Sequence, residues 1–189
     1  TDYIMALGPI VLGYCFDDVD HAVIQQIKKG SIFSLPHHLE IDVAEELVNI
    51  IPSAEMVRFG KNGSDVTAAA IRISRAYTGK DKIAICGYHG WQDWYIGTTS
   101  RNLGVPRSTK DLSLTFNYND IPSLEKLFNE NPGQIACVII EPIGIEEPDS
   151  LFLETVKELA HKNSAILIFD ELKTGLRFAL AGVQEYTGV

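Results

Sequence analysis

Two carboxylates, Asp170 and Glu171, directly follow an apolar run at residues 165–169. An unbroken run of five apolar residues predicts a strand that is buried on both faces of a parallel sheet. Ligands bind beyond the carboxyl ends of such strands, so the sequence places Asp170 where a ligand would be met. A carboxylate at the edge of a dry core needs a partner. That partner is either internal, such as Arg177 or a helix N-terminus, or it is the protonated ring nitrogen of a cofactor.

A second polar group, Asn62-Gly63-Ser64-Asp65, precedes a predicted helix. Backbone amides at a helix start can bind an anion, and the helix dipole favours negative charge there. The segment is therefore either a plain N-cap or a phosphate cradle. It is not a P-loop, since no Gly-Lys-Ser/Thr ends it, and no G-x-G-x-x-G indicates a dinucleotide site.

A third group, Tyr88 and His89, lies between two glycines in the loop after a predicted strand at 82–86. An aromatic ring on such a loop either stacks on a flat ligand or covers the core, and His89 is expected to form structural hydrogen bonds. A phosphate cradle, a stacking ring and a buried carboxylate together suit a flat, phosphorylated heterocycle with a basic ring nitrogen. Pyridoxal phosphate (PLP) is such a molecule, and an acidic partner keeps its pyridine nitrogen protonated.

The elements that position these groups alternate between strand and helix, which predicts right-handed βαβ units on a largely parallel sheet, an α/β fold. The predicted strands cover residues 56–59, 82–86, 114–116, 135–140 and 165–169. The predicted helices cover about 17–29, 39–50, 65–78, 120 onward and 151–161. The helix after Asp65 is expected to bury an apolar face made of Val66, Ala69, Ala70, Ile73 and Tyr77. Residues 1–52 are expected to form a helical lead-in, and residues 53–189 part of a large α/β domain.

The composition excludes several classes of function. The 189 residues are 46% hydrophobic and 22% charged, with a formal net charge of -9. The negative balance argues against a nucleic-acid partner, because there is no basic stripe to replace phosphate counterions. No apolar run reaches membrane-spanning length, and no signal peptide is expected. Cys15, Cys86 and Cys137 are odd in number and widely spaced, which predicts reduced thiols, a cytoplasmic location and no metal site.

Six motifs follow one another in a fixed order: Gly8–Gly13, Glu55–Phe59, Arg72–Gly79, Tyr88–Gly90, Glu141-Pro142 and Phe169–Arg177. In this order and spacing they resemble the class III PLP-dependent aminotransferases, most closely the glutamate-1-semialdehyde 2,1-aminomutase branch. The resemblance implies the large domain of the fold-type I PLP-dependent transferases, a three-layer α/β/α structure, truncated before a C-terminal small domain. It also implies PLP as the cofactor, a homodimer, and transfer of an amino group between small amino and keto substrates or within a semialdehyde.

The resemblance further implies roles for single residues. Asp170 matches the carboxylate that pairs with the pyridine nitrogen, the one catalytic role that falls within this chain. Glu146 matches an acidic position near the substrate. The other cofactor-binding positions are the phosphate-holding segment and the loop of the stacking ring: Asn62, Gly63, Ser64, Tyr88 and His89.

Several positions depart from the family pattern. Residues 62–66 are Asn-Gly-Ser-Asp-Val where the family usually has Ser-Gly-Thr-Glu-Ala. Leu7 replaces a tryptophan of the aminomutases, and Trp91 replaces a histidine. Lys173 replaces a glutamine that touches the phenolic oxygen of the cofactor in many aminotransferases. These changes leave the substrate open: a ω-amino acid or a keto-sugar is as plausible as glutamate semialdehyde.

The Schiff-base lysine of the family is expected in a Gly-Lys motif beyond Val189, because no lysine of this chain matches its position. The whole protein is therefore expected to be an enzyme of which these residues hold the cofactor-binding part. An alternative is that the chain is a catalytically inactive fragment, or a scaffold remnant that binds PLP. A nucleotide-sugar binder on a Rossmann-like sheet is a third interpretation, which the missing G-x-G-x-x-G opposes.

Overall fold

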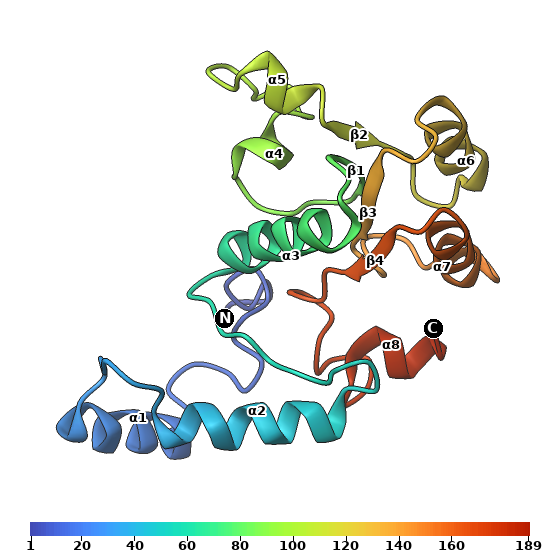
Figure 1. Cartoon of the computed structure of the whole chain (residues 1–189). Helices are drawn as coiled ribbons and strands as arrows, with labels where there is room; N and C mark the ends of the chain where they lie inside the picture. The colour runs from blue at the N-terminus through green and yellow to red at the C-terminus, as the bar shows by residue number, and fades with distance from the viewer. The chain divides into compact units, whose positions relative to one another are not determined.

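Four parallel strands form the sheet within residues 58–189, in the spatial order β2-β1-β3-β4. The strands are β1 (Lys82–Cys86), β2 (Ser113–Thr115), β3 (Ile135–Ile140) and β4 (Ile166–Phe169). The register pairs Ala84 of β1 with Val138 of β3, and Val138 with Leu167 of β4. Because all four strands run in one direction, their carboxyl ends share one edge of the sheet (Figure 1).

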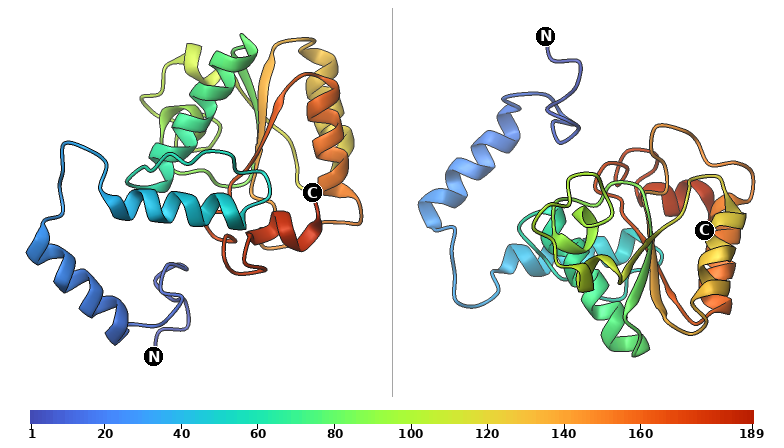
Figure 2. Two further views of the ribbon diagram at one scale, coloured as in Figure 1. Left: turned by 60° about the horizontal axis from the view of Figure 1, so that its bottom comes forward. Right: turned by 90° about the horizontal axis from the view of Figure 1, so that it is seen from above.

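Helices cover both faces of this sheet (Figure 2). One face carries α3 (Gly63–Thr78) and the short α4 (Asp93–Ile96), and the other carries α6 (Ile121–Glu130) and α7 (Phe152–Lys162). Alternate side chains of β1 point to opposite faces, so Ile83 and Ile85 pack towards α3 while Ala84 and Cys86 pack towards α6 and α7. Two short helices, α5 (Arg107–Lys110) and α8 (Gly182–Thr187), complete this part of the chain. The predicted three-layer α/β/α architecture is confirmed.

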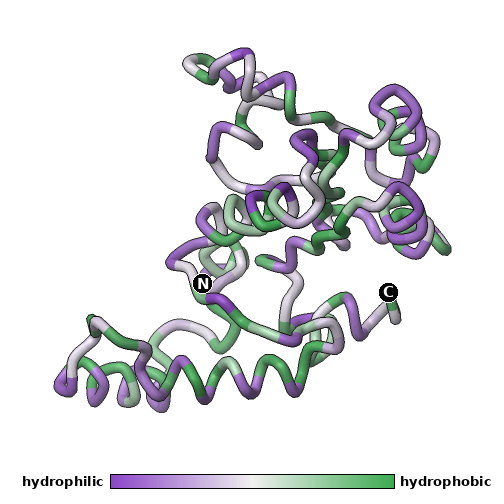
Figure 3. Tube along the Cα trace, viewed as in Figure 1, coloured by the Kyte–Doolittle hydropathy of each residue, from purple (hydrophilic) through white to green (hydrophobic).

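The burial of the strands follows their position in the sheet. Every residue of β3 is buried, because β3 has a neighbouring strand on each side and helices on both faces. The central strands are predominantly green, and therefore hydrophobic, in Figure 3. The prediction of a strand buried on both faces is wrong for β4, whose four residues are all half-buried. The reason is that β4 has a neighbouring strand on one side only.

The buried face of α3 differs from the predicted apolar stripe. Ile73 is 64% exposed and Tyr77 is 81% exposed. The residues that face the sheet are instead Ile71 and three hydroxyl-bearing residues, Ser64, Thr67 and Ser74. Two of these hydroxyls are satisfied within the helix, since Thr67 Oγ1 donates to the Gly63 carbonyl (3.0 Å) and Ser74 Oγ donates to the Ala70 carbonyl (2.9 Å). Burying these hydroxyls therefore costs little, and their small size lets the helix lie close to the strands.

The strand predicted at residues 56–59 is absent, and that prediction is wrong. Met56 is 88% exposed and Phe59 is 43% exposed, and the segment pairs with no strand of the sheet. A short apolar stretch forms a strand only where a ladder partner is available.

The structure describes all residues 1–189, and the chain divides into two compact units, Thr1–Val57 and Arg58–Val189. The first unit contains α1 (Asp17–Lys29) and α2 (His38–Ile50), neither of which buries a residue. The predicted domain boundary between residues 52 and 53 stays a prediction. No helix anywhere in the chain is long and apolar enough to cross a membrane.

The three cysteines differ in their environments, which predicts selective alkylation. Burial raises the pKa of the Cys86 and Cys137 thiols from 9.0 to about 12, and the charge of Glu141 adds to the effect at Cys86. Cys15 is exposed. Iodoacetamide at about pH 8 is therefore expected to modify Cys15 alone in the folded protein, as read by mass spectrometry. All three should react after unfolding in urea, and rapid labelling of Cys137 in the folded protein would contradict the prediction.

The same shifts predict the direction of a stability change in alkali. Between pH 9 and pH 12 the unfolded thiols lose protons that the folded thiols keep. The folded state then binds more protons than the unfolded state, so this contribution to the free energy of unfolding falls as the pH rises above 9.

Candidate active site

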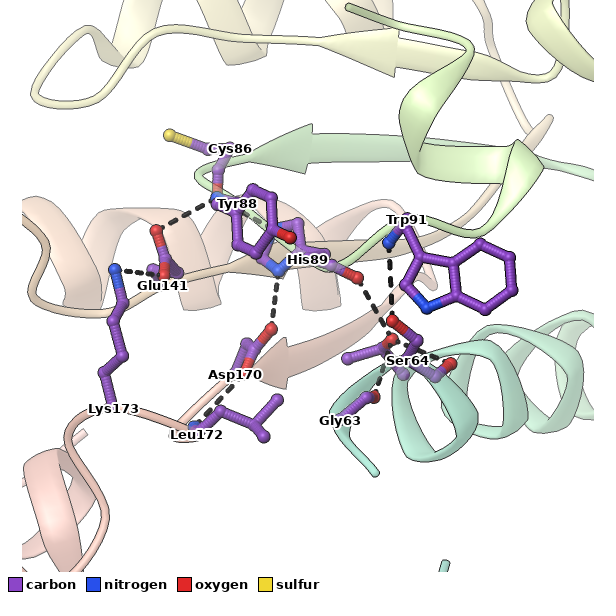
Figure 4. Close-up of polar contacts among 11 residues, drawn as sticks. Gly63, Ser64, Cys86, Tyr88, His89, Trp91, Glu141, Asp170, Leu172 and Lys173 are labelled. Carbon is purple, nitrogen blue, oxygen red and sulfur yellow. Dashed lines mark hydrogen bonds and ion pairs between the residues drawn. The ribbon is translucent and has the colours of Figure 1, made fainter. Parts of the chain in front are cut away.

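Three loops and one helix start meet at the carboxyl edge of the sheet (Figure 4). The loops are those that follow β1, β3 and β4. The helix start is the first turn of α3, which lies at this edge because α3 runs antiparallel to the strand that it precedes. Ser64, Tyr88 and Asp170 are thereby brought into one region, although more than a hundred residues separate the first from the last.

Asp170 is held by a buried pair with His89. The Oδ2 atom of Asp170 lies 2.7 Å from His89 Nδ1, and the two side chains are 3% and 0% exposed. The other ring nitrogen, Nε2, donates to the carbonyl of Cys86 at 3.0 Å, because a carbonyl can only accept. The Oδ1 atom of Asp170 accepts from the amide of Leu172 at 3.2 Å. The carboxylate is thus fixed in one orientation by groups from two different strand ends.

The internal partner of Asp170 is therefore neither of the two that the sequence suggested. Arg177 does not pair with it, and no helix N-terminus caps it. A histidine that leaves β1 fills this role, since β1 and β4 flank β3 and their loops meet above it. The ring of Trp94 stacks on His89, with ring centroids 6.1 Å apart, and covers it on the side of the sheet that carries α3.

The start of α3 presents unused hydrogen-bond donors. The side chain of Asn62 acts as the N-cap, with its Oδ1 accepting from the Asp65 amide at 3.0 Å. The amides of Gly63 and Ser64 have no acceptor, as expected for the first turn of a helix. Both amides stand at the positive end of a helix of 16 residues. This arrangement suits an anion.

The loop after β1 packs directly against this helix start. The amide of Trp91 donates to Ser64 Oγ at 3.3 Å, and Thr67 Oγ1, which donates to the Gly63 carbonyl, lies 3.3 Å from the carbonyl oxygen of His89. Gly90 has a φ of 99°, and a Cβ at this position would collide with Ser64 Oγ. Glycine is required here because only glycine tolerates both the backbone conformation and the close approach.

Tyr88 remains accessible in this loop. The residue is 60% exposed, and its ring lies edge-on to that of Tyr95, at a centroid distance of 5.4 Å and an interplanar angle of 83°. The interpretation that this ring covers the core is not what the structure shows. An exposed face of an aromatic ring beside a fixed carboxylate is available for stacking on a flat ligand.

Glu141 connects all three loops, a role that the sequence analysis did not assign. Its Oε2 accepts from the Tyr88 amide at 3.0 Å, and its Oε1 pairs with Lys173 Nζ at 2.6 Å. A Cβ on Gly87, whose φ is 103°, would lie 2.9 Å from Glu141 Oε2. A signal was present in the sequence, because Glu141 follows the apolar run of β3 just as Asp170 follows that of β4.

Glu171 holds the loop after β4 in place. Its carboxylate accepts from the amides of Val183 (2.8 Å) and Gln184 (3.2 Å), and from Thr174 Oγ1 (2.8 Å). These amides belong to the first turn of α8, so the side chain closes the segment between β4 and α8 into a loop. Gly182 has a φ of 72°, and a Cβ there would collide with the same carboxylate.

Glu146, the residue predicted to lie near the substrate, makes no polar contact with the other predicted site residues. It lies exposed in the loop after β3. Its charge is felt by Tyr118, whose pKa is raised to about 12 by burial first and then by the charges around it, including Glu147 and Glu146. Its expected role near a substrate stays a prediction.

The donors and acceptors at this edge fit PLP. The two free amides and the Ser64 hydroxyl match a phosphate, the exposed face of Tyr88 matches a flat ring, and Asp170 matches a protonated ring nitrogen. No group of three or more His, Cys, Asp or Glu side chains is gathered as a metal site would require.

Known proteins share both the sequence and this fold. Residues 1–182 match the sequence model of the family described as aminotransferase class-III. The 3-aminobutyryl-CoA aminotransferase of Cloacimonas acidaminovorans is 42% identical over 195 residues, which cover 100% of this chain and 46% of that protein. The structure of an ω-transaminase from Sphaerobacter thermophilus has a TM-score of 0.91 at 30% identity, covering 100% of this chain and 48% of that one.

A further solved structure, the FumI protein of Sphingopyxis sp. MTA144 in a form with PLP, has a TM-score of 0.91 at 29% identity. That match covers 100% of this chain and 47% of the other. The chain thus spans about half the length of the proteins that it matches.

Proposed function

Because this chain belongs to the class III aminotransferases, we propose that it forms the cofactor-binding part of an enzyme that transfers amino groups with PLP. The single observation that carries the proposal is the buried pair of His89 and Asp170, with the exposed ring of Tyr88 and the free amides of α3 beside it. When bound, PLP supplies an electron sink for the negative charge that develops on the substrate carbon.

In this proposal the chain's residues bind and orient the cofactor. Gly63 and Ser64 hold its phosphate through their amides and the Ser64 hydroxyl, and the dipole of α3 favours the negative charge. Tyr88 stacks on one face of the ring. Asn62 supports this site indirectly, because its side chain caps the helix and so orients the amides that follow it.

Asp170 holds a proton at the ring nitrogen, which keeps the ring electron-poor. His89 has a positioning role. Its Nδ1 holds the carboxylate of Asp170, and its Nε2 is held by the carbonyl of Cys86. Such a supporting layer keeps a reacting group in one geometry without reorganisation during the reaction.

The 42% sequence identity to a 3-aminobutyryl-CoA aminotransferase supports a β-amino acid or its thioester as the amino donor. The test uses the protein that carries this chain, loaded with PLP and supplied with 3-aminobutanoate and pyruvate. Alanine is the expected product, measured by chromatography, and a sample without PLP is the control. Absence of alanine with 3-aminobutanoate, with its CoA thioester and with glutamate would contradict the proposal.

The alternative, an inactive fragment or a scaffold that only binds PLP, has a different expected outcome. Borohydride would then trap no PLP on the protein, although PLP would still bind reversibly. Amino transfer within a semialdehyde and the homodimer stay predictions from the resemblance, and a cytoplasmic location stays a prediction from the cysteines.

A further inference from the structure

A cavity of about 340 Å³ opens next to the Glu141–Lys173 pair. It lies between the loop after β3 and the loop after β4, and its lining consists of Ile143, Gly144, Lys173, Thr174, Arg177 and Phe178. The volume is at the small end of the range for ligand sites, so it suits a short molecule and not a large one. Lys173 lines this cavity and also pairs with Glu141, the residue that accepts a hydrogen bond from the Tyr88 amide.

The charges in this lining are all positive. Two cations and no carboxylate face the cavity. Lys173 is compensated by Glu141 at 2.6 Å, whereas the guanidinium of Arg177 forms no hydrogen bond or ion pair. The Thr174 hydroxyl is already committed to Glu171. Arg177 is therefore the one uncompensated charge at the cavity.

An uncompensated arginine with apolar neighbours has a clear chemical preference. A guanidinium presents a planar set of donors that matches the two oxygens of a carboxylate or a phosphate. The side chains of Ile143 and Phe178 supply apolar surface for a short carbon chain. The cavity therefore has the elements of a site for a small organic anion.

We propose that this cavity binds the anionic group of the amino substrate, a carboxylate or a phosphate, and that Arg177 is its principal contact. The proposal rests on the proposed function, because it assigns the substrate class of the same site. Lys173 adds positive charge to the cavity. Through its ion pair with Glu141, it also connects the cavity with the loop that carries Tyr88.

The kinetic test compares amines with and without an anion. If the bound group is the substrate carboxylate, the variant Arg177→Gln is expected to lower kcat/KM for 3-aminobutanoate about tenfold or more, chiefly through KM, since it removes a charge-assisted contact. For butan-2-amine, which lacks the carboxylate, kcat/KM should change by less than about twofold. Arg177→Lys should recover part of the loss, and Arg101→Gln, an exposed arginine away from the cavity, is the matched control.

A second substrate distinguishes whether a carboxylate or a phosphate is the group that binds Arg177. If the carboxylate binds Arg177, the loss appears with 3-aminobutanoate. If a phosphate binds there, it appears with 3-aminobutanoyl-CoA and not with the free acid. An equal loss for the neutral amine and both charged substrates would overturn the proposal, as would no loss for any of them.

A binding measurement distinguishes this proposal from the proposed function. Calorimetric titration with 3-hydroxybutanoate and with CoA needs no turnover, and Arg177→Gln should weaken the binding of one of them about tenfold or more. A protein that binds such an anion through Arg177 but forms no amino product would contradict the proposed function alone. If Arg177→Gln changes neither the rate of amino transfer nor the affinity for the anion, the proposed anion site alone is contradicted.

Discussion

The variant Asp170→Ala is expected to reduce the rate of amino transfer by about 100-fold or more, even when PLP is saturating. The change removes the carboxylate proposed to hold a proton at the ring nitrogen. It also leaves His89, which is 0% exposed in its side chain, with a buried ring nitrogen that has lost its partner. Steady-state kcat measures the effect, with circular dichroism to verify that the variant is folded.

The matched variant Asp170→Asn separates the chemical role from the structural one. Asparagine fills the same space and can still bond to His89, so the stability of the protein should largely return. It carries no charge, so kcat should stay low. Asp111→Ala removes an exposed carboxylate, with 66% side-chain exposure, and should leave kcat unchanged. Near-normal turnover of Asp170→Ala would contradict the proposed role of Asp170 at the ring nitrogen.

The variant Glu171→Ala is expected to release α8 and the loop before it. Glu171 satisfies two amides of the first turn of α8 and the Thr174 hydroxyl, three bonds to a charged acceptor. Their loss should lower the free energy for local opening of this segment by about 3 kcal/mol. Amides of residues 183–187 would then exchange with deuterium about 100-fold faster, measured by mass spectrometry of peptides that cover this segment.

The control for this change is Glu158→Ala, which removes an exposed glutamate of α7. Its exchange rates should match those of the unchanged protein. Because Glu185 still accepts from the Ala181 amide in the Glu171 variant, the expected effect is loosening and not complete loss of the helix. Unaltered exchange in α8 after Glu171→Ala would show that the carboxylate does not hold the loop.

The two central strands of the sheet were predictable from local pattern in the sequence. The strands Lys82–Cys86 and Ile135–Ile140 were predicted with their observed bounds, because apolar runs between polar loops have one physical solution in a buried parallel sheet. The parallel topology then fixed the convergence of the loops, so Ser64, Tyr88 and Asp170 could be expected in one region.

The parts that depend on tertiary contact were not predictable. The outward face of α3 carries Ile73 and Tyr77, and only the close approach of the helix to the sheet explains why Thr67 and Ser74 face inward. The pairing of His89 with Asp170 depends on which two strand-end loops meet. The Glu141–Lys173 pair depends on a side chain that crosses from one loop to another, which no sequence spacing encodes.

One hydrogen bond at the start of α3 has a consequence for which molecules can be bound there. The Trp91 amide gives its hydrogen to the oxygen of Ser64, so one lone pair of that hydroxyl is already used. The hydroxyl hydrogen is then free to be given to an incoming group, together with those of the two neighbouring amides. A ligand that can only donate, such as an ammonium group, meets three hydrogens and finds a single remaining lone pair on Ser64, whereas an anionic oxygen can accept from all three donors.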